Sequence, residues 1–173
     1  MTMKHSYLIP LIFIALPVIS GSAPVRENTA SAEKVRKITI AIMNFDANNC
    51  PSSMGNAVSD MMTGKLFECP QFVLLERSRV QLAALHYGKR HGTVKDPFRA
   101  AAIGRMVSVE KVVVGSINKV GHFRIETRII DVQSGSIDVS LPITAHDEYD
   151  IQNAVEDMAE RIDNYYLGIP PIS

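Results

Sequence analysis

Hydrophobic and polar positions change their spacing several times along the chain, and each change predicts a new element. Lys37–Phe45 is rich in β-branched and apolar residues and predicts a buried strand that ends in a polar loop. Apolar residues then recur every three or four positions from Met54 to Leu66, which predicts a helix with Ser53 as a possible N-terminal cap. Phe72–Leu75 predicts a short second strand.

Two further helices are indicated by the residues at their ends. Ser78 can cap a helix that we expect to stop at Gly88. Asp96 places a capping side chain directly before Pro97, and proline is favoured at the first position of a helix. A third helix is therefore predicted from this point to about Met106.

The second half of the chain predicts a meander of three strands. Lys111–Val120 contains a continuous apolar run, which is typical of a strand covered on both faces. Gly121-His122 predicts a two-residue turn. The strand that follows alternates apolar and charged residues, which predicts that one of its faces is exposed to solvent. After a turn at Ser134-Gly135, Pro142 indicates that the third strand lies at an edge of the sheet.

The last part of the chain completes the predicted fold. Apolar residues from Ile151 to Tyr166 form one stripe at helical spacing, and Gly168 and two prolines follow it. The order β-α-β-α-α-β-β-β-α predicts an α/β (α+β) sandwich with a mixed sheet of about five strands. We expect a single domain over residues 37–168, followed by a tail of residues 169–173.

The amino terminus has the pattern of a targeting segment. A basic flank precedes an apolar run of 13 residues, Tyr7–Ile19, and small residues follow up to Ala23. This predicts a secretory signal over residues 1–23, because a membrane-spanning helix needs about 20 apolar residues. An uncleaved membrane anchor remains the alternative. Residues 24–36 are mostly small and polar, which predicts a flexible leader.

The composition narrows the class of protein. The chain has 173 residues, of which 46% are hydrophobic and 21% charged, with 18 basic and 18 acidic side chains. These values exclude a disordered chain, a collagen-like or coiled-coil repeat and a polytopic membrane protein. Without a net positive charge, nucleic acid is not an expected partner.

The two cysteines are not expected to form a disulfide bond. A predicted helix of about 13 residues separates Cys50 from Cys69 and spans roughly 20 Å. Bridged Cα atoms lie only about 4.4–6.8 Å apart, so a bridge within the chain is the less favoured alternative. Two ligands also cannot complete a tetrahedral metal site.

No catalytic constellation is found in the sequence. The patterns GxxxxGK[ST], GxGxxG, HExxH and GxSxG are absent, which gives no support to a nucleotide, zinc-protease or serine-hydrolase site. Asp46, at the end of the first predicted strand, is the most enzyme-like carboxylate, but a turn or cap role is favoured because it has no obvious partner. We therefore expect that the protein is not an enzyme and that it binds no cofactor and no metal ion.

The charges are strongly divided along the chain. Arg77–Arg105 holds seven basic residues and one acid, a local balance of +6, whereas Asp147–Asp163 holds seven acids and one base, a balance of −6. Opposed patches of this kind can guide self-association or docking to a charged partner. Two solvated helix faces without a partner are the alternative. The candidate interaction surface comprises Arg79, Lys89, Arg90, His91, Lys95 and Arg99.

Five short strings occur in an order that resembles a known family. They are Asn44-Phe45, Val73–Ser78, Ala101–Arg105, Val112–Ile117 and Arg128–Gly135. Together they resemble the CsgG family of curli-secretion periplasmic domains, and also the amino-terminal domain of TolB and the penicillin-binding-protein activator LpoB. The resemblance covers about Lys37 to Leu167. It implies an α/β sandwich in the envelope of a Gram-negative-type cell that works through protein contacts and has no catalytic residues.

Two departures from the curli exporters limit what the resemblance implies. No lipidated cysteine follows the signal, and the predicted strands meet at short turns that leave no room for membrane spans of about 9–11 residues. The predicted function is a non-enzymatic periplasmic or envelope interaction module that assists an outer-membrane secretion or envelope assembly system without a pore of its own. Envelope or outer-membrane proteins are the expected partners, and a homo-oligomer is possible.

Two other functions remain open from the sequence. One is a small envelope hydrolase that uses Asp46 and a histidine. The other is a sensor that binds peptidoglycan fragments through the basic helices.

Overall fold

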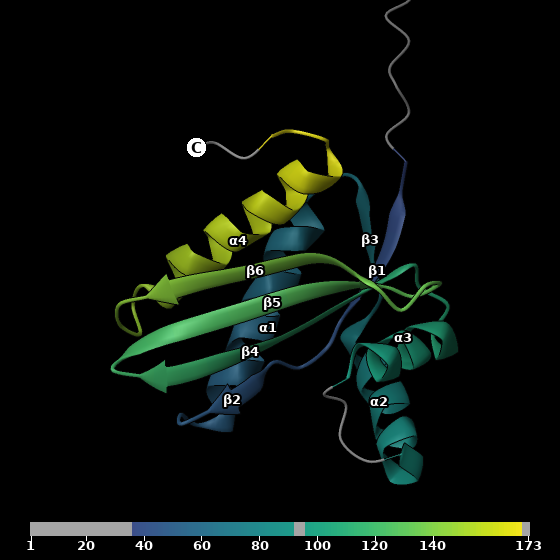
Figure 1. Cartoon of the computed structure of the whole chain (residues 1–173), viewed down its shortest axis with the longest axis horizontal. Coiled ribbons are helices and arrows are strands. Elements are labelled where there is room, and N and C mark those ends of the chain that lie inside the picture. The colour runs from purple at the N-terminus through teal and green to yellow at the C-terminus, as the bar shows by residue number, and fades with distance from the viewer. Residues whose placement is uncertain (1–35, 92–95, 171–173) are drawn as a thin grey trace, which may run out of the picture. The chain divides into compact units, whose positions relative to one another are not determined.

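Helices and strands alternate in the first half of the chain and give way to a meander, as predicted (Figure 1). The computed structural model describes residues 36–91 and 96–170. The strands are β1 (Ile38–Ile42), β2 (Asp46–Asn48), β3 (Phe72–Leu74), β4 (Lys111–Val120), β5 (His122–Asp131) and β6 (Ile137–Ala145). The helices are α1 (Ser52–Glu68), α2 (Arg77–His91), α3 (Pro97–Met106) and α4 (Ile151–Tyr166).

The predicted signal, most of the predicted leader and the end of the tail lie outside the described residues. The elements from β1 to α4 belong to one unit that spans Lys34–Ser173. Within the two described ranges, no helix combines the length and the apolar character that crossing a membrane requires.

All the described strands belong to one mixed sheet. β3, β1 and β4 are parallel neighbours, and β4, β5 and β6 are antiparallel neighbours, which gives the order β3-β1-β4-β5-β6. β2 pairs with β4 on the same edge as β1 but further along the strand. The sheet thus has six strands, one more than the approximate number predicted. The prediction that Pro142 marks an edge strand is confirmed, because β6 ends the order.

β2 is the strand that the sequence pattern did not predict. After β1 the backbone leaves the ladder at Phe45, whose N–H donates to the Ser59 hydroxyl of α1 at 2.8 Å. The chain then rejoins the sheet, with Asp46–Asn48 in register with Ser116–Asn118 of β4. Asp and Asn are poor strand formers, so pairing with β4 imposes this conformation against local preference.

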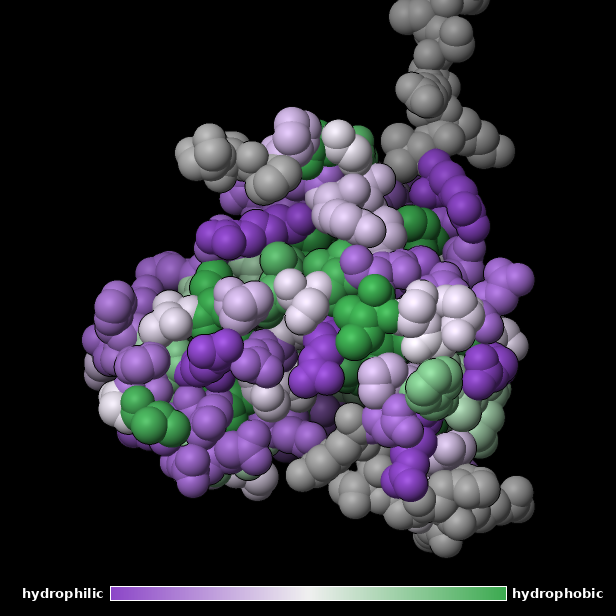
Figure 2. Space-filling view, in the orientation of Figure 1, coloured by the Kyte–Doolittle hydropathy of each residue, from purple (hydrophilic) through white to green (hydrophobic). Residues whose placement is uncertain are grey.

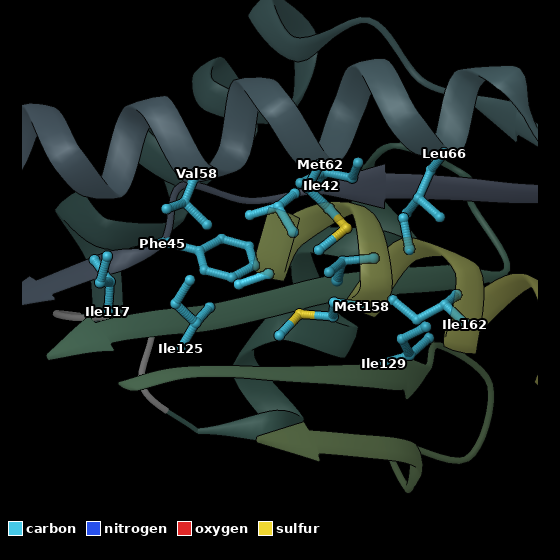
Figure 3. Packing of buried hydrophobic residues seen from close by; sticks show 14 of the residues in the cluster. Ile42, Phe45, Val58, Met62, Leu66, Ile117, Ile125, Ile129, Met158 and Ile162 are labelled. Carbon is cyan, nitrogen blue, oxygen red and sulfur yellow. The ribbon is translucent and has the colours of Figure 1, made fainter. Parts of the chain in front are cut away.

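Helices cover the two faces of the sheet unequally. α1 and α4 pack on one face and bury the larger core, where Val58, Met62 and Leu66 of α1 approach Met158 and Ile162 of α4 (Figure 3). α2 and α3 pack on the opposite face and bury a smaller core. The smaller core includes Ala41, Val80, Ala101, Ile103, Val112 and Ile130. Val112 and Val113 of β4 face the two different cores, which confirms the predicted cover on both sides.

Three predicted helix-end signals are wrong. Ser53 does not cap α1, because Pro51 occupies the N-cap position and no side chain bonds the first turn. α2 continues past Gly88 to His91, and Ser78 lies inside the helix, where its hydroxyl donates to the Glu76 carboxylate at 2.7 Å. A glycine in a helix is a weak stop signal, because it costs only about 1 kcal/mol relative to alanine.

The turn between β4 and β5 is tighter than predicted. Val120 and His122 are directly paired, so His122 is the first residue of β5 and Gly121 alone stands between the strands. Gly121 adopts a φ of 74°, a left-handed conformation that glycine reaches without steric cost.

The predicted cap of α3 is confirmed and can be tested by mutation. The Asp96 carboxylate accepts a hydrogen bond of 3.0 Å from the Phe98 N–H, and Pro97 occupies the first turn. We expect Asp96→Ala to lower the free energy of unfolding by about 1 kcal/mol, because it leaves that N–H without its partner. Ser53→Ala, at a serine that makes no cap bond, is the control and should change it by less than about 0.5 kcal/mol. Urea denaturation measures both values, and equal losses would contradict the assignment.

Candidate interaction surface

None of the described helices covers part of one sheet face. α2 and α3 contact β1, β4 and β5 near the beginning of β4, and α1 and α4 lie on the opposite face. Beyond α2 and α3, alternate residues of β4, β5 and β6 are at least partly exposed. We call these residues the open sheet face: Ser116, Asn118, Val120, Arg124, Glu126, Arg128, Ser140, Pro142 and Thr144.

Across the middle of the open sheet face, one acidic side chain lies between two basic ones. Arg124 Nε lies 2.9 Å from one carboxylate oxygen of Glu126, and Arg128 Nη2 lies 4.0 Å from the other. Exposed pairs of this kind add little to stability, but one carboxylate between two guanidinium groups leaves a net positive charge. Figure 2 views the molecule in the orientation of Figure 1, with α1 behind the strands, and shows mainly hydrophilic residues over β4–β6.

Two residues of the predicted interaction surface lie on the same side of the sheet as the arginines of β5. Arg79 on α2 is exposed and Arg99 on α3 is partly exposed, and both helices lie on the same side of the sheet as Arg124 and Arg128. Lys89, Arg90 and His91 belong to the end of α2, and Lys95 lies outside the described residues. The sequence already marked Arg124, Glu126 and Arg128 as a wet strand face, but only the packing shows that α2 and α3 share that side of the sheet.

At least two basic residues of the +6 segment, Arg77 and Arg105, bond to other parts of the fold. Arg77 of α2 pairs with Asp60 of α1 and donates to the Asn44 side chain, and burial lowers the pKa of Arg77. Arg105 of α3 donates to the Val132 carbonyl oxygen at 2.6 Å. The basic segment therefore presents less free charge than its composition suggests.

The predicted opposed charge patches do not share a surface. The acids of residues 147–163 lie on and just before α4, which packs on the face opposite α2 and α3. Any attraction between the two patches would thus have to act between different molecules.

The residues of the hydrolase alternative are dispersed. Asp46 is exposed at the start of β2 and faces Ser116 of β4 in the strand register. The exposed histidines His86, His122 and His146 lie in α2, at the start of β5 and before α4. In the ranges that the structure describes, no group of three His, Cys, Asp or Glu side chains could hold a metal ion.

The two cysteines flank α1 and both thiols are free. Burial, together with a contact to Asp163, raises the pKa of Cys69 to about 12. The Cys69 thiol is therefore protonated at neutral pH and is a weak nucleophile.

Comparison with known proteins shows a likeness in fold. No family model and no curated protein sequence matches the chain. The LpoB C-terminal domain from Salmonella enterica is similar in structure, with a TM-score of 0.53 and 15% identity over 68% of this chain and 89% of that domain. TolB from Acinetobacter baumannii gives 0.54 and 18% over 79% of this chain and 30% of TolB.

A third similar structure is the lipoprotein GNA1162 from Neisseria meningitidis, with a TM-score of 0.54 and 11% identity over 73% of this chain and 97% of that protein. The resemblance to the CsgG family stays a prediction. The chain has the mixed α+β fold of the LpoB C-terminal domain and of the matching part of TolB.

Proposed function

We propose that this protein is a non-enzymatic, envelope-associated interaction module that assists an outer-membrane secretion or envelope assembly system. Its partner is a protein with an acidic surface that docks on the open sheet face and on Arg79 and Arg99 beside it. The observation that carries the proposal is the uncovered, arginine-bearing side of the sheet. The secretory pattern of residues 1–23 and the fold likeness to LpoB and to a lipoprotein support the cellular location.

The chemistry of the open sheet face suits an acidic protein partner. Arginine is enriched in protein interfaces, and its planar guanidinium can bind a carboxylate through two parallel hydrogen bonds. Glu126 holds Arg124 in place before any partner arrives, so less side-chain freedom is lost on binding. Lys89, Arg90, His91 and Lys95 belong to the same predicted surface, and their positive charge would add to long-range attraction.

A pore of its own is not part of the proposed function. β4 and β5 have 10 residues each and are paired along their whole length. Ile117 and Ile125 are fully buried beneath α1 and α4, so lifting these strands into lipid would dismantle the larger core.

Site-specific photo-crosslinking in intact cells tests the proposal. A photoreactive amino acid at Ser140 samples the open sheet face, and the same amino acid at the exposed Asn153 of α4 samples the opposite side. We expect one defined envelope protein to be captured from Ser140 and not from Asn153. Capture from Asn153 alone, or no adduct from either position in an exported protein, would contradict the proposed surface.

Removal of the two arginines gives a quantitative prediction. We expect Arg124→Ala combined with Arg128→Ala to weaken binding of the captured partner at least about 10-fold, because two charge-assisted contacts are lost. Arg161→Ala, an exposed arginine on α4, is the matched control and should change the affinity less than about 2-fold. Calorimetric titration at two salt concentrations measures this, and the wild-type affinity should fall more steeply with salt than that of the double variant. Equal losses in both variants would rule out this surface.

A further inference from the structure

β6 has a neighbouring strand on one side only. It ends the order of the sheet, and no other strand in the two described ranges pairs with its outer side. Ser140, Pro142 and Thr144 of β6 are exposed, whereas Leu141 and Ile143 are only partly buried against the larger core. An exposed edge strand presents unpaired backbone N–H and C=O groups, on which a strand of another chain can form.

The hydrogen bonds of β4 show which way the backbone groups of each strand point. The Met43 N–H donates to the Val113 carbonyl oxygen at 2.9 Å, so the backbone groups of Val113 face β1. Because these groups alternate along a strand, those of Val114 face β5, where Arg128 is the register partner. The backbone groups of Arg128 therefore bond β4 and point away from β6.

The same alternation identifies the outward groups of β6. Ser140 is the register partner of Arg128, so this pair is not hydrogen-bonded and the N–H and C=O of Ser140 point outward. Thr144 is placed in the same way opposite Arg124, because the register is unbroken between the two pairs. Pro142 lies halfway between them, and it fits there because it has no N–H to give to β5. The outer edge thus offers two N–H groups and three carbonyl oxygens.

The side chains beside this edge favour an acidic strand. Ser140 and Thr144 carry short side chains on the open sheet face. Their register partners on β5 are Arg128 and Arg124. An added strand would lie about 10 Å from β5, a distance that arginine and glutamate side chains can bridge together over a short residue. Glu126 lies between the two arginines, so the best match is two acids four residues apart with an uncharged residue halfway between them.

A second copy of β6 fits this edge less well. Two paired β6 strands would bring two Pro142 residues into the new ladder, and each of them lacks an N–H. The arginines of both copies would also lie on the same face of the joined sheet, where like charges repel. A strand from a different protein avoids both costs.

We propose that the acidic protein partner docks by adding one antiparallel strand to the outer edge of β6. Its backbone bonds the outward groups of Ser140, Pro142 and Thr144, in the manner of other complexes formed by strand addition. Two of its acidic side chains meet Arg124 and Arg128, and the apolar side chains of its other face lie beside Leu141 and Ile143. The inference rests on the proposed function, because it states how the partner binds the open sheet face.

Hydrogen exchange detected by NMR tests the proposal on the full chain. The probe is a heptapeptide blocked at both ends, acetyl-Val-Glu-Val-Thr-Val-Glu-Val-amide. At saturating peptide we expect the Ser140 and Thr144 amides to exchange at least about 10-fold more slowly, because they gain hydrogen bonds. The same peptide with lysine in place of both glutamates should bind at least about 10-fold more weakly, since its charges face the two arginines.

Two substitutions at one position separate the backbone from the side chain. Ser140→Pro removes an outward N–H that does not bond β5, and we expect a loss of at least about 10-fold in affinity for the peptide. Ser140→Ala keeps this N–H and should leave the affinity within about 2-fold of wild type. Thr144→Pro provides an independent variant if Ser140→Pro does not fold, which a thermal unfolding scan reveals, and it should also weaken binding.

Three results would overturn strand addition. They are unchanged exchange of the Ser140 and Thr144 amides up to the solubility limit of the peptide, equal binding of the glutamate and lysine peptides, and an equal effect of Ser140→Pro and Ser140→Ala. Crosslinking from Ser140 and the effect of removing the two arginines require no backbone hydrogen bond. Failure of this inference and failure of the proposed function can therefore be told apart.

Discussion

Gly55→Ala is expected to lower the free energy of unfolding by about 3 kcal/mol, at the upper end of the usual cost of overpacking. Gly55 lies in α1 directly against the backbone where the chain passes from β1 to β2, and a Cβ there would collide with the Phe45 carbonyl oxygen. A flexible side chain could turn aside, but a carbonyl group can move only if the backbone moves. That backbone is held by the hydrogen bond from the Phe45 N–H to Ser59 Oγ, and Ser59 lies on the same helix.

Gly64→Ala in the same helix provides the control. A Cβ at Gly64 meets no atom within 4 Å, so this change should stabilise the protein by about 0.5–1 kcal/mol through helix propensity alone. Guanidinium denaturation of both variants measures the difference. A loss of stability at both glycines, or at neither, would show that the approach of α1 to the β1–β2 junction is not as close as described.

Lys111→Met is expected to lower the free energy of unfolding by about 2–3 kcal/mol at pH 7, because it leaves two carboxylates without their shared cation. Lys111 lies between Asp131 and Asp138 at the end of the sheet, and the three side chains are mostly buried. Burial alone would lower the pKa of Lys111, but its hydrogen bonds to the two aspartates outweigh burial and raise it. The Tyr166 hydroxyl also donates to Asp138, at 3.3 Å.

The cost of Lys111→Met should depend on pH. The hydrogen bond from Lys111, followed by those from Ser134, holds the pKa of Asp131 well below its ordinary value. A carboxyl group with a depressed pKa in the folded state contributes its stability above its unfolded pKa of about 4, and this stability is lost as the pH falls below that value. The variant lacks this contribution, so the gap between wild type and variant should shrink from pH 7 to pH 3.

Lys65→Met tests whether the effect belongs to the buried cluster. Lys65 of α1 pairs with Glu156 of α4 at 3.0 Å, but both side chains are exposed, so little change is expected at either pH. Denaturation curves of the three proteins at pH 7 and pH 3 give the comparison. A gap that is independent of pH would contradict the role assigned to Lys111.

Sequence patterns correctly predicted the features that depend on residues close together in the chain. Asp96 and Pro97 marked the start of α3 correctly, because the capping bond spans only two residues. The alternation in β5 placed Ile125 inside and Arg124 outside, because the side chains of a strand point to opposite faces. Ser53 had the right type of side chain for a cap but lies one residue inside α1, where no cap bond forms.

Elements formed by distant contacts were missed. β2 has a sequence typical of a loop and becomes a strand only because β4 offers a free edge beyond β1. The end of α2 was missed for a local reason, because glycine is a weak stop signal and the helix continues for three residues past Gly88 to His91. The candidate surface was predicted on the basic helices, whereas Arg124 and Arg128 join it only through the packing of α2 and α3 on their side of the sheet.

The amino-acid sequence by itself determined the succession of helices and strands apart from β2, the solvent-exposed face of β5 and the separation of basic from acidic segments, since each depends on residues that are close along the chain. Tertiary structure alone decided that the two charged segments lie on opposite faces, that the open sheet face continues the basic side, and that Gln71 is buried with a side-chain oxygen that no described residue bonds. These features depend on which distant segments pack together. The spacing of residues along one segment does not show which other segments contact it in the folded protein.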